Sequence, residues 1–113
     1  NPKPVQQPLP LWIGASGEKR MMPIAARFAD VWHCGGGTQK LIRKARLMDE
    51  LCEKAGRDPA TLRRASSLSL EGSHDEIAAR SAALEEARFS YLLCGWPPQG
   101  RPLVEAFAER FLG

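Results

Sequence analysis

The stretch best suited to chemistry is a turn of four small residues, Gly14–Gly17, which reads Gly-Ala-Ser-Gly. An apolar, strand-favouring run, Leu11–Ile13, precedes the turn, and a helical pattern begins at Glu18. A strand that leads through a glycine turn into a helix exposes backbone N–H groups without helical partners, and the helix dipole adds positive potential there. Phosphate is the usual occupant of such a site. The sequence therefore predicts a phosphate-binding turn. The alternative is an ordinary strand–helix turn in which a serine caps the helix.

Side chains around this turn would add to an anion site. The two glycines permit close approach of the backbone, the serine adds a hydroxyl, and two basic residues add positive charge. Solvated charge at the start of a helix is, however, the commoner role of such basic residues. The candidate contacts in this stretch are Gly14, Ala15, Ser16, Gly17, Lys19 and Arg20.

Trp32 and His33 are further candidates, because they lie at the end of the next predicted strand. The indole could line a flavin-type ring, although packing in the core explains it without a cofactor. The histidine has no acid beside it to form a general-base pair, and a partly buried imidazole bonded to the backbone is the simpler interpretation. No Gly-x-Ser-x-Gly elbow is present, so the sequence identifies no catalytic residue.

Composition and charge exclude several classes of protein. The 113 residues are enough for one domain or a piece of a larger one. The net charge of +3 is mild, and the basic residues are scattered among acidic ones, which argues against a nucleic-acid surface. No apolar run approaches the roughly 20 residues of a membrane span. The three cysteines form no Cys-x-x-Cys pair, which argues against a zinc site and favours the reduced thiols of a cytoplasmic protein.

Hydrophobic periodicity predicts four strand–helix units in succession. A lead-in with four prolines, residues 1–10, is expected to be extended. The expected strands are Leu11–Gly14, Asp30–Cys34, Arg64–Leu70 and Phe89–Cys94. The expected helices are Glu18–Ala29, Thr38–Ala55, Ser73–Arg88 and a last one from about Pro102, with a short turn at Pro59–Leu62.

Each expected helix has a face suited to burial. In the first, this face is Ile24, Ala25 and Phe28. In the second, it is Leu41, Ala45, Met48 and Cys52, opposite a solvated face of Lys40, Arg43, Lys44 and Glu50.

Alternating strands and crossover helices require parallel pairing, so the predicted fold class is α/β. Two architectures fit: a piece of a (β/α)8 TIM barrel, or a small open doubly wound sheet. A complete barrel needs about 250 residues, so about four units would make a half-barrel. Such a half-barrel would leave two strand edges and one sheet face without partners.

Three stretches, taken in order, resemble the bacterial luciferase-like family. Leu11–Arg20 reads Leu-Trp-Ile-Gly-Ala-Ser-Gly-Glu-Lys-Arg, and Ala25–Trp32 reads Ala-Ala-Arg-Phe-Ala-Asp-Val-Trp. Cys52–Pro59 reads Cys-Glu-Lys-Ala-Gly-Arg-Asp-Pro. The resemblance covers residues 2–59 in order, and the tail agrees more loosely. Within the family, the chain is similar to the branch of luciferase-like oxidoreductases that uses the deazaflavin coenzyme F420.

The resemblance implies that residues 11–113 are the C-terminal half of the barrel, preceded by the lead-in of residues 1–10. It also implies that Gly14–Gly17 contacts the cofactor phosphate, with F420 as the cofactor and FMN as the alternative. Gly72 and Ser73 are the second choice for the phosphate, because such barrels often bind phosphate after their last two strands. Val31 and His33 depart from the glycine and asparagine that are usual in the family.

Three functions follow as hypotheses. The first is an F420-dependent oxidoreductase that transfers hydride between the cofactor and a small organic substrate. The second is an FMN-dependent monooxygenase of the same family. The third is a non-catalytic fragment that folds by dimerisation. The expected partners are a small-molecule substrate and either the missing N-terminal half of the barrel or a second copy of the chain, with no metal, nucleic acid or membrane.

Overall fold

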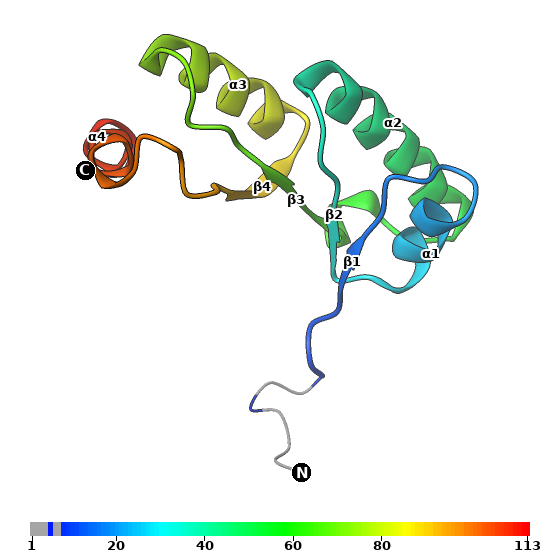
Figure 1. Cartoon of the computed structure of the whole chain (residues 1–113). Helices are drawn as coiled ribbons and strands as arrows, with labels where there is room; N and C mark the ends of the chain where they lie inside the picture. Colours follow the sequence, from blue (N-terminus) through cyan, green and yellow to red (C-terminus); the bar gives the residue numbers. More distant parts are fainter. Residues whose placement is uncertain (1–4, 6–7) are drawn as a thin grey trace.

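Four short strands, each followed by a helix, form one parallel sheet in the computed structural model, which describes residue 5 and residues 8–113 (Figure 1). The strands pair in chain order, β1-β2-β3-β4, and every pair is parallel. The predicted lead-in, residues 1–10, falls mostly outside the described residues. The strands are β1 (Trp12–Gly14), β2 (Val31–His33), β3 (Arg63–Ser67) and β4 (Phe89–Leu93). The helices are α1 (Met21–Phe28), α2 (Thr38–Lys54), the 3₁₀ turn η1 (Pro59–Thr61), α3 (His74–Glu86) and α4 (Arg101–Phe111).

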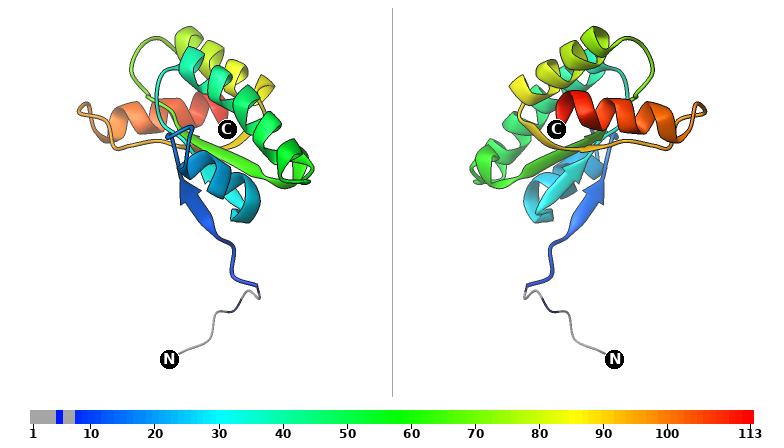
Figure 2. Two further views of the ribbon diagram at one scale, coloured as in Figure 1. Left: turned by 90° about the vertical axis from the view of Figure 1, so that its right-hand side faces the viewer. Right: turned by 90° about the vertical axis from the view of Figure 1, so that its left-hand side faces the viewer.

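The core lies between the sheet and a single layer formed by α1, α2 and α3 (Figures 1 and 2). Trp32 of β2 is fully buried there, together with Met22 of α1 and Met48 of α2. The molecule is 22 Å thick, which is about the depth of one sheet and one layer of helices. The alternation predicted from the sequence is confirmed, and its four units equal half of the eight in a (β/α)8 barrel.

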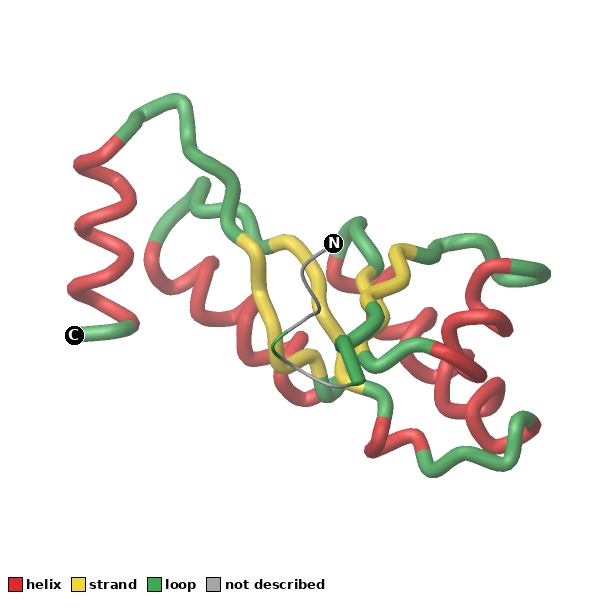
Figure 3. Tube along the Cα trace, turned by 90° about the horizontal axis from the view of Figure 1, so that it is seen from below, coloured by secondary structure: helices red, strands yellow, loops and turns green. Residues whose placement is uncertain are grey.

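The opposite face of the sheet has no helix layer among the described residues (Figure 3). Ile13 and Leu92 pack against the core, so their neighbours along the strands face the other way. Trp12 is 46% exposed, Tyr91 is 36% exposed, and their ring centroids lie 5.4 Å apart. This open face carries large apolar side chains of the kind that parallel sheets ordinarily bury.

The start of α1 differs from the sequence prediction. We expected a helix from Glu18, but α1 begins at Met21, because residues 18–20 form a separate turn. Pro23 lies in the first helical turn, where its ring is tolerated. The predicted burial of Ile24 and Phe28 is wrong, since they are 43% and 59% exposed. The buried face is Met22, Ala25, Ala26 and Ala29.

α2 buries the four residues that the sequence indicates, Leu41, Ala45, Met48 and Cys52. The prediction that Lys44 lies on the solvated face is wrong, because Lys44 is only 7% exposed. Its side chain crosses to the turn that follows β1, as described below.

The Gly56-Arg57-Asp58 segment after α2 joins three elements. Gly56 has φ +74°, a conformation that glycine adopts without strain and that ends a helix. Arg57 donates from Nη1 to the carbonyl oxygens of Ala29 (2.7 Å) and Ala26 (3.3 Å) at the end of α1. Asp58 accepts from the backbone N–H of Ala60 and caps η1. This motif therefore has a structural role.

α4 stands apart from the other helices, beyond the end of β4 (Figure 1). None of its residues is fully buried. The Phe111 ring meets the His74 ring edge-on, with 5.9 Å between the centroids, and His74 is half-buried.

Candidate functional site

The candidate site lies where the neighbouring strands β1 and β2 end. Gly14 pairs with His33 in the parallel register, and the backbone N–H of Ala15 donates to the carbonyl oxygen of His33 (2.9 Å). A hollow of about 220 Å³ opens beside these strand ends. The structure thus brings together part of the predicted site, since the hollow is lined by Gly14, Ala15, Ser16, His33, Cys34 and Gly35.

Three successive carbonyl groups of the turn are bound from the protein side. The indole Nε1–H of Trp32 donates to the carbonyl oxygen of Ala15 (2.7 Å). The Lys44 ammonium donates to the carbonyl oxygen of Ser16 (2.6 Å). The carbonyl oxygen of Gly17 accepts from the backbone N–H of Met22 in α1 (2.9 Å). The turn is therefore fixed by contacts with β2, α2 and α1.

Each of these three peptide groups directs its N–H away from the partner that binds its own carbonyl. A trans peptide is planar, so its N–H and C=O point opposite ways. Each bound carbonyl therefore turns away the N–H of the following residue: Ser16, Gly17 and Glu18 in succession. Within the described residues, none of these three N–H groups donates a hydrogen bond. Ser16 lines the hollow, whereas Gly17 and Glu18 are exposed outside it.

The two glycines of the turn leave its outer side open. A Cβ atom built on Gly14 or on Gly17 would meet no atom within 4 Å. Neither glycine has the left-handed φ found at Gly56, so the turn does not depend on glycine for its backbone conformation. The benefit of glycine here is the space over the backbone, which a phosphate needs for close approach.

Lys44 and Glu18 form an ion pair beneath the turn. The Lys44 Nζ lies 2.9 Å from Glu18 Oε1, with the lysine side chain 9% exposed and the glutamate side chain 48% exposed. The hydrogen bond from Lys44, reinforced by its charge, holds the pKa of the Glu18 carboxyl below its usual range. Glu18 makes this contact from the turn of residues 18–20 that precedes α1.

Of the other predicted contact residues near the turn, His33 lines the hollow, and Lys19, Arg20 and Trp32 do not. Lys19 and Arg20 are exposed, lie outside the hollow, and form no ion pair with any described residue. Trp32 is fully buried, so it supports the turn and cannot lie against a cofactor ring. His33 is half-buried, and its imidazole donates to no described residue. Burial raises the pKa of the neighbouring Cys34 thiol, which keeps it neutral.

Gly72 and Ser73 begin the N-terminal turn of α3, away from the hollow. The Ser73 hydroxyl oxygen accepts a hydrogen bond from the backbone N–H of Glu76 (3.1 Å) and so caps α3. Gly72 has φ +96°, and the Glu76 carboxylate lies directly over it. Asp75 adds a second acidic residue in this turn. The serine cap and the acidic side chains make this helix terminus poorly suited to a phosphate.

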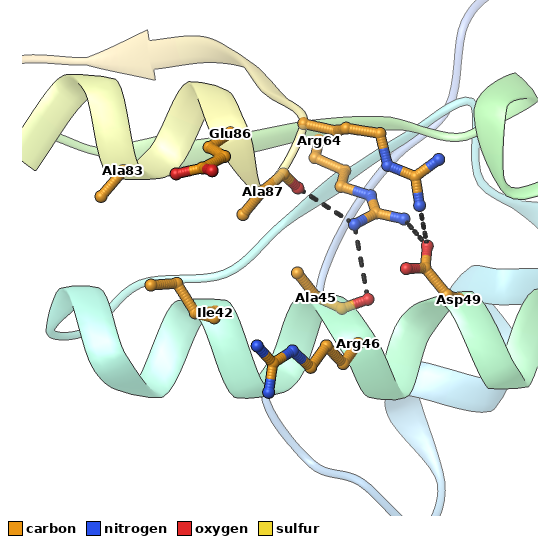
Figure 4. Close-up of a pocket in the computed structure, with 9 residues that line it drawn as sticks. Ile42, Ala45, Arg46, Asp49, Arg64, Ala83, Glu86 and Ala87 are labelled. Atoms are coloured by element: carbon orange, nitrogen blue, oxygen red, sulfur yellow. Dashed lines mark hydrogen bonds and ion pairs between the residues drawn. The ribbon is translucent and has the colours of Figure 1, made fainter.

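A larger cavity, about 440 Å³, lies between α2 and α3 (Figure 4). Its polar centre is Arg64, which is 2% exposed and donates to the carbonyl oxygens of Ala45 and Ala87. The Asp49 carboxylate accepts from both Arg64 and Arg88. The Asp49 carboxylate thus bridges the two arginines, and the cluster ties β3 to the two helices. Arg46 and Glu86 also line the cavity and form no ion pair within the described residues.

Sequence reasoning missed Lys44 as part of the site. The helical spacing did contain a signal: Lys44 is three residues after Leu41 and four before Met48, so it shares their buried face. A lysine in that position needs a polar partner. The partner comes from a distant turn, which the spacing within one helix does not reveal.

The described residues contain no group of three or more histidine, cysteine or acidic side chains placed to hold a metal ion. None of the helices in the described part of the chain is both long and apolar enough to cross a membrane.

The fold and the site thus define a class: a parallel α/β sheet with a glycine turn at the carboxyl end of its first strand, where such folds bind ligands. The sequence profile of the family described as luciferase-like monooxygenase matches residues 1–105. The chain therefore belongs to the luciferase-like monooxygenase family, which supports an oxidoreductase or monooxygenase activity for it. A search of curated proteins finds no match to this sequence.

Proposed function

We propose that the chain is the phosphate-binding part of an F420-dependent oxidoreductase. Membership of the luciferase-like family supports the class of reaction. The bound deazaflavin would supply the hydride chemistry, while the protein binds and orients it. The single observation that carries the phosphate role is the arrangement of the Gly14–Gly17 turn, with three carbonyls bound inward and three N–H groups left free.

The site fits the phosphate end of such a cofactor rather than the whole molecule. The hollow of about 220 Å³ is smaller than the usual 300–1,000 Å³ of a pocket for an entire ligand of that class. Its lining is mostly backbone and small residues, which favours an anion over an aromatic ring. We place the ring and the substrate against a second set of strands, from either the N-terminal half of the barrel or a second copy of the chain.

An FMN-dependent monooxygenase is the second candidate. The description of the matched family as monooxygenase favours it, and both cofactors carry a phosphate. F420 also has an acidic tail, for which Lys19 and Arg20 would provide charge near the turn. Tighter binding of F420 than of FMN supports the first candidate, and the reverse order supports the second. For either candidate we propose the cytoplasm as the compartment, consistent with three unpaired cysteines.

The phosphate role is tested by substituting Gly17. A valine side chain would occupy the open space over the turn, so Gly17→Val should block approach to the free N–H groups. Charge-assisted hydrogen bonds contribute roughly 1.5–3 kcal/mol each, so loss of two should weaken FMN binding by at least about a hundredfold. Lys19→Ala removes one exposed charge and should cost less than about 1 kcal/mol.

Calorimetry on both variants, with FMN and with riboflavin, measures these effects, and circular dichroism checks the fold. Riboflavin lacks the phosphate, so its affinity should not respond to Gly17→Val in the same way. Equal, small losses for the two variants would mean that the turn is only a connection between β1 and α1.

A further inference from the structure

The Lys44 side chain has a role that neither its sequence position nor the family assigns. It reaches from α2 to the turn after β1, 28 residues away in the sequence, and donates to the Ser16 carbonyl oxygen at 2.6 Å. The same ammonium pairs with Glu18 at 2.9 Å. One buried cation thus binds the residue before Gly17 and the residue after it.

Because Lys44 is buried, its ammonium group needs hydrogen-bond partners within the protein. The lysine is 7% exposed, and removal of an ammonium group from water is costly unless the protein replaces the lost hydrogen bonds. Ser16 and Glu18 are the partners that the described residues provide. The charge therefore constrains the turn, because any rotation of the Ser16–Gly17 peptide would leave the ammonium without its carbonyl partner.

The orientation of the Ser16–Gly17 peptide determines which of its groups faces an anion. In the planar peptide between Ser16 and Gly17, the bond from Lys44 to the carbonyl fixes the opposite direction for the Gly17 N–H. Lys44 also adds positive charge behind this peptide, which polarises the N–H toward an anion. An anion on the outer side would meet an N–H group that is already aligned, so little ordering is needed on binding.

We propose that Lys44 is a positioning residue for phosphate: from beneath the turn it fixes the Ser16–Gly17 peptide so that the Gly17 N–H faces the ligand. This inference rests on the proposed function above. Lys44 does not itself contact the phosphate, because its ammonium is occupied on the protein side by Ser16 and Glu18. Glu18 is secondary, since it pairs with Lys44 but does not bind the peptide.

The test compares three variants of the full chain with the wild type. Lys44→Met removes the donor and keeps the length of the side chain. Glu18→Gln removes the ion pair and leaves the bond to the Ser16 carbonyl. Arg64→Met is the matched control, because it also removes a buried cation and its ion pair, but at a site that does not touch the turn.

Affinities for FMN and riboflavin separate positioning from general stability. We expect Lys44→Met to weaken FMN binding at least about tenfold with no matching loss for riboflavin, and Glu18→Gln to cost less than about threefold. Arg64→Met should leave the ratio of the two affinities unchanged, even if the protein is less stable. An unchanged ratio in Lys44→Met, with a wild type that prefers FMN, would overturn the inference and leave the proposed function standing.

Two nuclear magnetic resonance measurements decide the inference without a ligand. Backbone relaxation should show that the Ser16 and Gly17 amides are ordered in the wild type and lose order in Lys44→Met. The wild-type Lys44 ammonium should give a protected proton signal, which needs no variant to fold. Equal order in both proteins, or no protected ammonium signal, would contradict the role of Lys44. A wild type that binds FMN no better than riboflavin would instead contradict the proposed function.

Discussion

At the scale of residues, the candidate site depends on side chains that lie behind the backbone rather than on those that face the ligand. Trp32 and Lys44 each bind one carbonyl of the turn, and neither is exposed to the hollow. The outer side consists of glycine, alanine and serine, whose small size leaves the N–H groups accessible. The proposed anion site depends on charge and bulk beneath the turn and on open space above it.

The ionisation of Glu18 reports directly on the contact with Lys44. Its pKa is lowered in the folded chain, chiefly by the hydrogen bond from Lys44, so the carboxylate stabilises the turn above the unfolded pKa and loses this effect as the pH falls through the folded pKa. We predict that Lys44→Met returns the pKa of Glu18 toward its ordinary value, measured by carboxyl chemical shift against pH. Asp58 provides an internal control, because its carboxylate accepts from a backbone N–H far from Lys44. A Glu18 pKa that is the same in both proteins would contradict the ion pair.

The sequence predicted the place of the turn but not what holds it. Glycines and small residues between an apolar run and a helix are visible in the chain itself. The contacts from Lys44 and Trp32 span 28 and 17 residues and depend on how the helices and strands pack. The sequence alone therefore allows a ring contact for Trp32, whereas its full burial and its bond to the Ala15 carbonyl make it a support for the backbone.

At the scale of elements, the Gly56-Arg57-Asp58 segment joins the end of α2, the end of α1 and the start of η1. Arg57 binds two of the last carbonyls of α1, which otherwise lack partners within the helix. We predict that Arg57→Met lowers the free energy of unfolding by about 1–3 kcal/mol, measured by urea denaturation. Arg101→Met is the control, because among the described residues Arg101 forms only an exposed pair with Glu105, typically worth about 0.3–0.5 kcal/mol. Equal effects of the two substitutions would rule out the capping role.

The predicted elements are correct in type and order, and the errors concern element boundaries and which side chains of α1 and α2 are buried. α1 begins three residues later than predicted, and this start keeps Pro23 in the first helical turn, where its missing N–H is tolerated. That later start is accompanied by the exposure of Ile24 and Phe28 and the burial of Ala26 and Met22. The hydrophobic pattern identifies the helix, but Pro23 limits how early the helix can begin.

At the scale of the whole molecule, the open sheet presents apolar surface on several sides. β1 and β4 are edge strands, and Trp12 and Tyr91 lie on the uncovered face. Met21, Ile24 and Phe28 form a further exposed apolar stripe on α1, with spacing of three and four residues. Exposed edges and apolar faces of this kind favour association with another chain or domain.

We predict that the isolated chain elutes from size-exclusion chromatography as a dimer or a larger species. Trp12→Lys, on the open face, should shift it toward the monomer, because a charge there opposes burial. Trp96→Lys is the matched control, since Trp96 is 72% exposed but lies in the loop after β4, outside the sheet. A monodisperse monomer of 12.5 kDa with a sharp, cooperative melt would contradict the expected need for a second set of strands.

The central claim is that the free N–H groups of the Gly14–Gly17 turn bind a phosphate, and amide chemical-shift mapping tests it most directly. In a titration of the ¹⁵N-labelled chain with FMN, we predict that the largest shifts occur at the Ser16, Gly17 and Glu18 amides. The same titration with riboflavin should leave these three amides unchanged, because riboflavin lacks the phosphate. Shifts centred on Gly72 and Ser73, or equal shifts at the turn with both molecules, would contradict the claim.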